Sequence, residues 1–260
     1  MREVIWDIET FPIVALSWRA YKIDSLVKIL QETRVISVAW KTIGENAVHS
    51  RALPDFPGYK AGIFNLDDRA LVKFIAEEIL GKADITVAHN GKSFDLAITY
   101  GRMFVHGMKP PPQSILIDTK NGASSTFRLD KNNLEFISEL TGGKPKVQHE
   151  GLPLWLKCAD KGDMKAWNKM KRYNRNDVAI LEPVYTRMKP WIPRKFPNSN
   201  LVEGTVNRCR VPGCVGDQFI RDGFGYNGVS KYQKLRCKKC GAPNRGRNII
   251  VDMSERPLIR

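Results

Sequence analysis

The stretch VIWDIET at residues 4–10 places two carboxylates, Asp7 and Glu9, in a segment otherwise rich in β-branched and aromatic residues. That composition predicts a β-strand. Because side chains alternate between the two faces of a strand, Asp7 and Glu9 would project from the same face, where their like charges repel. Either the strand ends here and water solvates both groups, or something cationic lies between them.

Other short apolar segments follow this stretch, and strands then alternate with helices along the chain. We expect strands at residues 3–9, 13–20, 34–40, 84–89 and 114–119, and helices at 66–80, 93–107, 132–143 and 166–188. Ser93 is expected to cap the second helix, and Pro183 to kink the last. This order predicts a mixed α/β sheet with helices packed on it.

Composition bounds the kind of partner. The chain has 260 residues, 42% of them hydrophobic, and 42 Lys and Arg against 27 Asp and Glu give a net charge of +15. Such a charge favours a polyanionic partner, nucleic acid before a membrane surface, although a basic protein can also simply be soluble. No apolar run approaches the roughly 18 residues of a spanning helix, and a signal-peptide core is absent from the first residues. We therefore expect no membrane partner and a cytoplasmic protein, in a prokaryotic or phage-infected cell and associated with the nucleoid.

A proline-rich segment divides the chain. The residues MKPWIPRKFPNSN (188–200) include Pro190, Pro193 and Pro197, which a continuing helix would not tolerate. From Arg194 to the end there are 14 Lys and Arg but five Asp and Glu, so the tail is the more basic part. We expect a large domain at 1–189, a linker at 190–203 and a small domain at 204–260.

Three more residues stand out by their context. Asp95 falls in the first turn of an expected helix, just after a strand, and Tyr173 and Asp177 lie four apart on the last expected helix. Each has an ordinary explanation. An acid in a first turn stabilises the helix dipole, and a Tyr and an Asp often share a helix surface. The Asp-x-Glu pattern of the opening stretch can likewise arise by chance.

The combination is more informative than its parts. Together they form an ordered set of four carboxylates and one phenol, on a first strand, at a strand-to-helix turn and on a late helix. Mg²⁺ and Mn²⁺ take oxygen ligands, and two-metal phosphoryl-transfer sites hold their ions about 3.5–4 Å apart among carboxylates. Two such cations would also neutralise the repulsion between Asp7 and Glu9. The sequence thus predicts a site for two Mg²⁺ or Mn²⁺ ions.

The motifs WDIET (6–10), HNGKSFD (89–95) and YNRND (173–177) resemble, in this order, the three motifs of the DEDD superfamily of 3′→5′ exonucleases. That superfamily has an RNase H-like fold and includes the proofreading domains of DNA polymerases. Tyr173 is similar to its tyrosine branch, because the histidine branch has His five positions before the last Asp, where this chain has Arg172. The resemblance spans residues 1–188 and looks closest to stand-alone phage nucleases. It implies an RNase H-like mixed sheet flanked by helices.

The resemblance also implies roles for individual residues. Asp7 would bridge both metals, Glu9 and Asp177 would complete the first site, and Asp95 would serve the second directly or through water. Tyr173 would orient the attacking water. Contacts to the nucleic-acid strand are expected from Asn90, Thr10 and Phe11, while Asp118, at a strand end, is expected to be structural.

Four of the five cysteines cluster near the end of the chain. Cys209 and Cys214 form one pair, and Cys237 and Cys240 form a second pair 22 residues later. Paired thiolates of this kind suit a tetrahedral structural Zn²⁺, with redox-active or incidental thiols as the alternative. Cys158 is expected to be a buried small hydrophobic residue. The segment resembles the zinc ribbons of transposases, and a module of this size depends on its metal for folding.

Basic and aromatic residues are interleaved between the two cysteine pairs. The basic residues expected to bind nucleic acid are Arg221, Lys231, Lys234, Arg236, Lys238 and Lys239. Phe224, Tyr226 and Tyr232 lie among them and would stack on bases. A ribbon that docks on a protein, with its basic residues kept for solubility, is the alternative.

These features favour a metal-dependent 3′→5′ exonuclease that releases nucleoside 5′-monophosphates, with DNA favoured over RNA. Single-stranded DNA or a 3′ end is the expected substrate, and replication or repair proteins are possible partners. Two alternatives stay open: a noncatalytic binding or recruitment protein on the same fold, and an endonuclease or transposase-like enzyme. The filled catalytic positions count against the first, and the Tyr-x-x-x-Asp spacing against the second.

Overall fold

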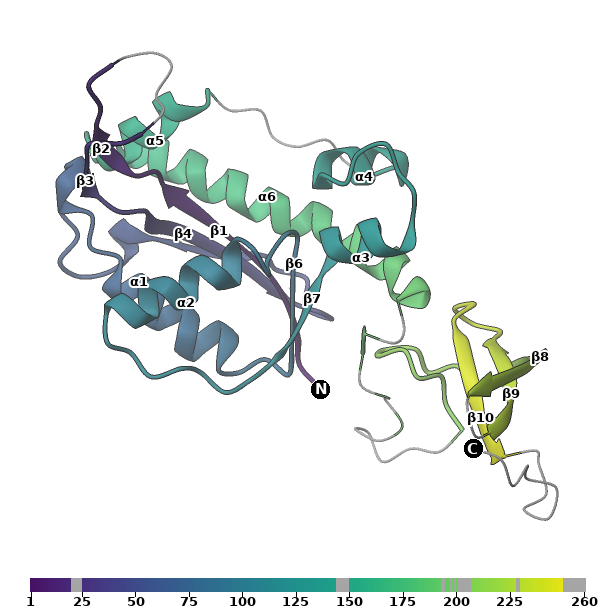
Figure 1. Cartoon of the computed structure of the whole chain (residues 1–260). Helices are drawn as coiled ribbons and strands as arrows, with labels where there is room; N and C mark the ends of the chain where they lie inside the picture. The colour runs from purple at the N-terminus through teal and green to yellow at the C-terminus, as the bar shows by residue number, and fades with distance from the viewer. Residues whose placement is uncertain are drawn as a thin grey trace. The chain divides into compact units, whose positions relative to one another are not determined.

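A computed structural model of the chain describes residues 1–19, 25–143, 150–192, 195, 196, 198, 200, 207–227 and 230–249. The chain divides into two compact units, Met1–Tyr185 and Thr186–Arg260 (Figure 1). Half of the expected linker at 190–203 lies outside the described residues. Within the described part, no helix is both long and apolar enough to cross a bilayer.

The first unit is built on a five-stranded mixed sheet. Its strands are β1 (Glu3–Phe11), β4 (Arg34–Thr42), β5 (His49–Ala52), β6 (Ile85–Ala88) and β7 (Ile115–Asp118). They lie in the order β5-β4-β1-β6-β7, with β4 antiparallel to both neighbours and β6 and β7 parallel to β1. A central first strand flanked by one antiparallel strand and two parallel ones is the RNase H-like arrangement, which confirms the expected fold. A short hairpin, β2 (Val14–Leu16) and β3 (Lys28–Gln31), stands beside this sheet.

Helices cover both faces of the sheet. The helical elements of this unit are η1 (Leu53–Asp55), η2 (Ile63–Asn65), α1 (Arg69–Phe74), η3 (Ile75–Leu80), α2 (Asp95–Val105), α3 (Thr119–Thr126), α4 (Leu134–Leu140), α5 (Leu152–Ala159) and α6 (Met164–Met188). Figure 1 shows α1 and α2 against one face and α6 against the other. The last residues of α6, after Tyr185, and the short helical turn that follows, η4 (Lys189–Trp191), already belong to the second unit.

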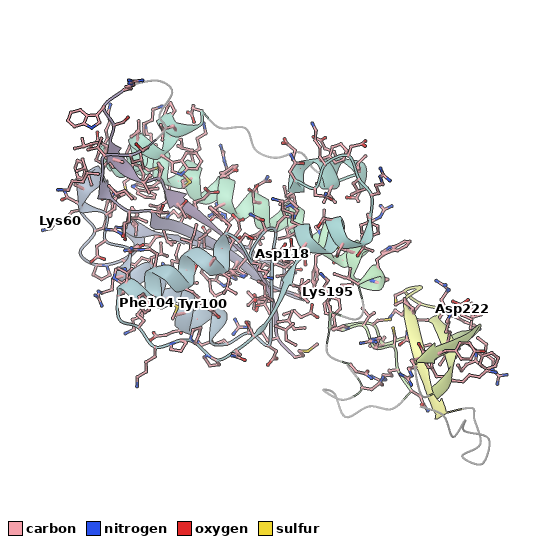
Figure 2. All side chains as sticks on the ribbon, viewed as in Figure 1. Lys60, Tyr100, Phe104, Asp118, Lys195 and Asp222 are labelled. Carbon is pink, nitrogen blue, oxygen red and sulfur yellow. The ribbon has the colours of Figure 1, made fainter. Side chains whose placement is uncertain are left out.

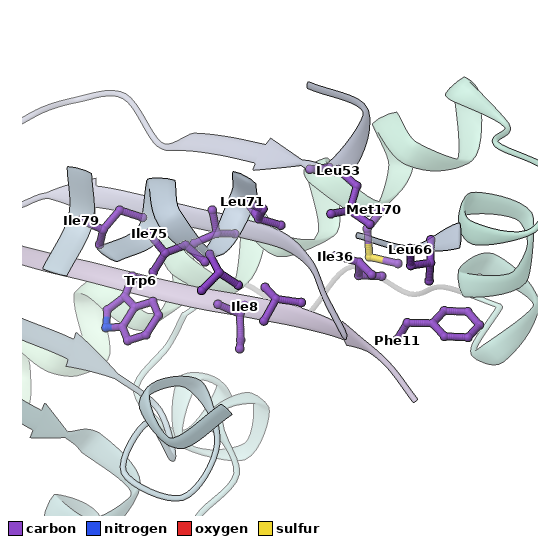
Figure 3. Close-up of a cluster of buried hydrophobic side chains, with 14 of the residues drawn as sticks. Trp6, Ile8, Phe11, Ile36, Leu53, Leu66, Leu71, Ile75, Ile79 and Met170 are labelled. Atoms are coloured by element: carbon purple, nitrogen blue, oxygen red, sulfur yellow. The ribbon is translucent and has the colours of Figure 1, made fainter. Parts of the chain in front are cut away.

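Alternation along β1 separates core from site. Trp6 and Ile8 are buried in one hydrophobic cluster with Leu71 of α1 and Ile75 of η3 (Figure 3). Burying each such apolar side chain contributes about 1.5–3 kcal/mol to folding. Asp7 lies between Trp6 and Ile8 in sequence, so its side chain projects from the opposite face, toward α6.

Several local expectations need correction. The N-cap of α2 is Phe94 rather than Ser93, and no side-chain hydrogen bond caps this helix. The helix expected at 66–80 is α-helical only to Phe74 and continues as a π-helix, η3. The strand expected at 13–20 is reduced to Val14–Leu16. The expected last helix begins at Met164, and Pro183 lies inside it.

The second unit contains a three-stranded antiparallel sheet. Its strands are β8 (Phe219–Asn227), β9 (Ser230–Cys237) and β10 (Pro243–Ile249), in the order β10-β9-β8. Cys209, Val211, Cys237 and Ala242 form its buried cluster, against which Cys214, Phe219 and Cys240 pack. All four of the clustered cysteines therefore contribute to the small core of this unit.

Candidate metal sites

Three carboxylates meet between β1 and α6. One oxygen each from Asp7, Glu9 and Asp177 can be chosen so that all three lie within 4.8 Å of one another. Asp7 and Glu9 share a face of β1 because they are two apart on a strand, and Asp177 reaches them from the helix that covers this face. Asp177 is 4% exposed, whereas Asp7 and Glu9 are partly open to solvent.

A buried amide fixes the orientation of Asp7. Asn174 Nδ2 donates hydrogen bonds to Asp7 Oδ2 (2.7 Å) and to the Asp7 carbonyl oxygen (3.2 Å). Ser37 Oγ on β4 donates in turn to Asn174 Oδ1 (3.0 Å). Ser37 and Asn174 are both fully buried, so bulk water cannot form hydrogen bonds with their polar side-chain atoms. The relay holds Asp7 between β4 and α6, and the sequence analysis had assigned no role to either residue.

Asp95 approaches β1 from the start of α2. Its Oδ1 accepts a hydrogen bond from the Ile8 amide (3.0 Å), beyond the point where β6 stops pairing with β1 at Ile5. Asp95 is 1% exposed, and its Oδ2 is buried without a hydrogen-bond partner among the described residues. Burial raises the pKa of Asp95 to about 7, and the negative charge of Asp118 raises it as well. The hydrogen bond from the Ile8 amide lowers this pKa, but burial outweighs it. A cation beside Oδ2 would reverse that effect.

The position of Asp95 differs from that of the other three acids. It is not one of the three residues whose oxygens come within 4.8 Å of one another. The described structure therefore brings Asp7, Glu9 and Asp177 together as one set and leaves Asp95 at its margin.

Tyr173 lies beside the carboxylates and is held by a tryptophan. Burial raises the pKa of the Tyr173 phenol, and the charges of Asp177, Glu9 and Asp7 raise it further, so the group is neutral at ordinary pH. The ring of Trp155, on α5, meets the Tyr173 ring edge to face with 6.4 Å between centroids. Trp155 Nε1 also donates to the Thr10 carbonyl oxygen (2.9 Å). α5 thereby connects the end of β1 to the phenol.

Two pockets open beside this group of acids. One, of about 230 Å³, is lined by Asp7, His89, Asn133, Leu134, Glu135 and Asp177. The other, of about 370 Å³, is lined by Glu9, Thr10, Pro12, Gly151, Leu152 and Trp155. Each pocket contains at least one carboxylate of the set, so a bound molecule can reach the acids from both.

His89 braces one wall of the smaller pocket. Its Nε2 lies 2.9 Å from the carbonyl oxygen of Asn132, and a carbonyl only accepts, so this nitrogen carries a proton. The Asn133 side chain then caps α4 by accepting from the Phe136 amide (3.1 Å). His89 thus fixes the loop that leads into α4, from which Leu134 and Glu135 face the pocket.

The turn before α2 explains two other residues of the second motif. Asn90 has a φ of 76°, and its amide donates to Asp118 Oδ1 (3.1 Å). A Cβ on Gly91 would lie 2.6 Å from the Ala88 Cβ, so only glycine fits there. Asp118, at the junction of β7 and α3 (Figure 2), also accepts from the Lys92 and Asn121 amides, as its expected structural role requires.

Phe11 lies differently from a residue that contacts a substrate strand. Its side chain is 1% exposed and belongs to the hydrophobic core of the first unit. Only its backbone remains for a contact. Thr10, by contrast, lines the larger pocket and remains a candidate contact.

The donor set of the acidic group fits hard divalent cations. All of its candidate ligand atoms are carboxylate oxygens, which Mg²⁺ and Mn²⁺ prefer. The buried Oδ2 of Asp95 adds an oxygen that has no hydrogen-bond partner among the described residues. The group can therefore bind divalent metal.

The four C-terminal cysteines form a second candidate metal site. One sulfur from each lies within 4.8 Å of the others, with 3.6 Å between Cys209 and Cys240 and 3.9 Å between Cys214 and Cys237. A tetrahedral Zn²⁺ with Zn–S bonds of about 2.3 Å would set its sulfurs about 3.8 Å apart. All four are free thiols. A Cβ on Gly216 would lie 2.7 Å from Cys237 Sγ, so the loop can pass the sulfurs only as glycine.

The basic residues expected to bind nucleic acid have varied surroundings. Arg236 is paired with Asp222 (2.7 Å), a residue labelled in Figure 2. Lys231 Nζ lies over the rings of Phe224 (4.5 Å) and Tyr226 (5.8 Å). Lys238 and Lys239 lie on the turn between the two cysteines of the second pair. Both are exposed, and so is Arg221. Lys234 lies on β9, as Lys231 and Arg236 do.

Comparison with known proteins supports the fold. No family model and no curated protein matches the chain. Among solved structures, the chain is similar to the family B DNA polymerase from the hyperthermophilic archaeon Pyrobaculum calidifontis, with a TM-score of 0.51 and 14% sequence identity. The match covers 88% of this chain and 31% of the polymerase, so the chain spans about a third of that protein's length. At this identity the likeness establishes a shared fold.

Proposed function

We propose that the protein is a metal-dependent 3′→5′ exonuclease that hydrolyses phosphodiester bonds in nucleic acid. The observation that carries the proposal is the convergence of Asp7, Glu9 and Asp177 within 4.8 Å on the sheet of an RNase H-like fold. These are three of the four acids in motifs that resemble the DEDD exonucleases. The superfamily includes proofreading domains of DNA polymerases, and one solved structure to which this chain is similar is a DNA polymerase.

The chain's residues have distinct parts in the proposed reaction. Asp7, Glu9, Asp95 and Asp177 would hold two Mg²⁺ or Mn²⁺ ions, which together activate water and stabilise charge on the leaving 3′ oxygen. Asn174 keeps Asp7 oriented, through the hydrogen bonds described above. The neutral Tyr173 phenol would orient the attacking water by hydrogen bonding. The products are a nucleoside 5′-monophosphate and a strand one nucleotide shorter.

We propose single-stranded DNA or a 3′ end as the substrate, with replication or repair proteins as possible partners. A net charge of +15 supports a polyanionic ligand. We further propose a nuclease domain at 1–189, a linker at 190–203 and a ribbon at 204–260 that holds one structural Zn²⁺ and assists binding. The four sulfurs gathered around one point support this zinc.

The test compares wild type with Asp7→Ala and Tyr173→Phe on 5′-labelled oligonucleotides in Mg²⁺ or Mn²⁺. We expect wild type to give a ladder of products shortened from the 3′ end, and a 3′ phosphorothioate or other blocked terminus to prevent it. Asp7→Ala should lose cleavage by at least about 100-fold, because loss of the shared ligand affects both metals. Exposed Arg172→Ala is the matched control on the same helix and should cleave as wild type does.

Three outcomes would contradict the proposal. Equal degradation by wild type and Asp7→Ala would mean that the nuclease activity arises elsewhere. An intact oligonucleotide that nevertheless binds wild type in Mg²⁺ and Mn²⁺ would identify a noncatalytic binding protein. Internal cleavage of a 3′-blocked strand would indicate an endonuclease.

A further inference from the structure

A groove of about 800 Å³ runs over one face of the sheet in the second unit. Arg208, Arg210, Arg221 and Arg245 are the charged residues that line it, and no carboxylate lies among its described lining residues. The chain has thus placed four arginines around one concave surface in a unit of modest size. Positive charge concentrated in a groove favours an extended anionic ligand.

Two asparagines hold the loop that carries two of these arginines. The Asn200 side chain accepts from the Arg208 amide (3.0 Å) and donates to the Arg208 carbonyl oxygen (2.7 Å). Asn244 Oδ1 accepts from the Arg210 amide (2.9 Å). Between the two arginines, Cys209 is fully buried in the cysteine cluster. The same loop therefore supplies a sulfur to the candidate zinc site and arginines to the groove.

Within the part of the chain that the structure describes, the guanidinium groups of Arg208, Arg210 and Arg221 form no ion pair. The Nε of Arg210 is also buried without a hydrogen-bond partner among the described residues. Arg236 differs, because it binds Asp222. Unpaired arginines in a groove are suited to phosphate groups, which they bind through several N–H donors.

Aromatic rings lie on the same face of the sheet. Phe224 lines the groove and is 43% exposed, and Tyr226, two residues further along β8, is 69% exposed. Lys231 lies over both rings, and register pairs it with Tyr226 across the strands. Exposed rings beside cations form the kind of platform on which unpaired bases stack.

We propose that this groove binds single-stranded nucleic acid, with phosphates on Arg208, Arg210 and Arg221 and a base stacked on Phe224. The inference rests on the proposed nucleic-acid substrate and specifies where the second unit holds it. It also revises the basic set expected from the sequence: Arg208 and Arg210 enter, and Arg236 leaves because its charge is used by Asp222. A duplex buries its base faces in its own stack and cannot use the Phe224 ring.

The experiment measures binding of fluorescein-labelled (dT)15 to the full-length protein by anisotropy, without Mg²⁺ or Mn²⁺ so that the strand stays intact. We expect Arg221→Ala and Phe224→Ala to weaken binding about 5-fold or more. For single strands, log K falls with log salt by roughly 0.7 per phosphate contact, so the double variant Arg208→Ala/Arg210→Ala should lower that slope by about 1.4. Bound zinc and circular dichroism identify variants that fail to fold.

Lys195→Ala is the matched control, because it removes one exposed positive charge from the same unit outside the groove lining. It should bind (dT)15 within about twofold of wild type. Equal losses in Lys195→Ala and Arg221→Ala would mean that net charge alone determines binding, and wild-type affinity in folded Phe224→Ala would reject stacking. Either result would overturn the proposal, as would tighter binding of a 15-base-pair duplex.

A (rU)15 arm identifies the natural strand. Whichever of (dT)15 and (rU)15 binds more tightly, the result supports the groove and shows whether the groove prefers DNA or RNA. Failure of this inference is distinguishable from failure of the proposed function. If the groove variants bind (dT)15 normally while Asp7→Ala abolishes cleavage, the groove alone is rejected. If the groove variants bind (dT)15 more weakly while Asp7→Ala still cleaves as wild type does, the nuclease site alone is rejected.

Discussion

Asn174 connects the Asp7 carboxylate to the scaffold at the scale of single residues. Because a group that orients a ligand tunes metal affinity, we expect Asn174→Ala to raise the Mn²⁺ concentration for half-maximal cleavage about 10-fold or more. The measurement is a Mn²⁺ titration of oligonucleotide cleavage. It should be accompanied by thermal unfolding, since removing a buried hydrogen-bonded amide also costs about 1–3 kcal/mol of stability.

Ser37→Ala is the graded control for this prediction. It removes the hydrogen bond to Asn174 Oδ1 and leaves both bonds to Asp7, so the Mn²⁺ titration should shift less than in Asn174→Ala. A destabilised Asn174→Ala protein with an unshifted Mn²⁺ titration would show that this residue has only a structural role.

The difference between Asp7 and Asn174 also shows what a sequence contains at this scale. Asp7 and Glu9 share a face because of a two-residue period, and Tyr173 and Asp177 because of a helical one, so local spacing is enough to propose them. Asn174 bonds to residues 137 and 167 positions away, and Trp155 bonds to one 145 positions away. Nothing in a local pattern records such distant partners.

At the scale of elements, Asp68 ties β4 to two helices. It is the N-cap of α1, it accepts from the Val35 amide (3.0 Å), and Arg102 of α2 binds both of its oxygens (2.8 and 2.9 Å). Together with Asp67 and His106 it could also hold a metal by distance, but Arg102 already occupies both carboxylate oxygens. The cluster is better explained as an anchor.

Asp68→Asn should therefore be strongly destabilising and pH-dependent. Burial raises the pKa of Asp68, but bonds from Arg102, His106 and the Val35 amide outweigh it and lower the pKa below its usual value. A lowered folded pKa means that the stabilisation is complete above the unfolded value of about 3.9 and is lost as pH falls through the folded one. We expect a loss of about 3–5 kcal/mol at pH 7 that narrows below pH 4.

Urea unfolding of both proteins from pH 3 to 7 measures this difference. Exposed Asp67→Asn is the neighbouring control and should change the free energy of unfolding by less than about 1 kcal/mol. A gap between wild type and Asp68→Asn that stays constant down to pH 3 would contradict the assigned anchor.

Four strands of the main sheet, β1, β4, β6 and β7, were predictable because each has a strong period or apolar run, whereas β5, with the sequence HSRA, has neither and was missed. Helices were less so. α3 and α5 were missed, since α3 is rich in Ser, Thr and Gly and α5 is eight residues long. Ser93 has the right chemistry for a cap, yet the Asn90 turn places Phe94 at the N-cap and brings Asp95 to the Ile8 amide. A tertiary contact overrides the local preference here.

At the scale of the whole molecule, the two units should respond differently to loss of metal. We expect purified protein to contain about one Zn²⁺ per chain, and a strong zinc chelator to unfold the second unit. The first unit has its own apolar core, so cleavage of short oligonucleotides should survive after Mg²⁺ is restored. Zinc by mass spectrometry, circular dichroism and cleavage report on these changes.

Gly216→Ala provides a genetic version of the same test. The new methyl group would press on Cys237 Sγ, so zinc retention should fall, whereas Gly101→Ala has open space and should retain zinc fully. Full zinc occupancy in Gly216→Ala would show that the loop has another path around the metal.

The sequence indicated two domains and the four thiols, but the arginine groove depends on strand pairing and on Asn200 and Asn244, which no motif marks.

The two oxygens of Asp95 suggest a laboratory use for the protein. Oδ1 serves the scaffold at the Ile8 amide, and Oδ2 has no hydrogen-bond partner among the described residues. Asp95→Asn keeps an acceptor for the amide and removes the charge, so it should melt near the wild-type temperature and fail to cut, while Asp95→Ala should also lose stability. Immobilised Asp95→Asn would then be a substrate trap, and sequencing what it retains would identify the strand that the intact protein consumes.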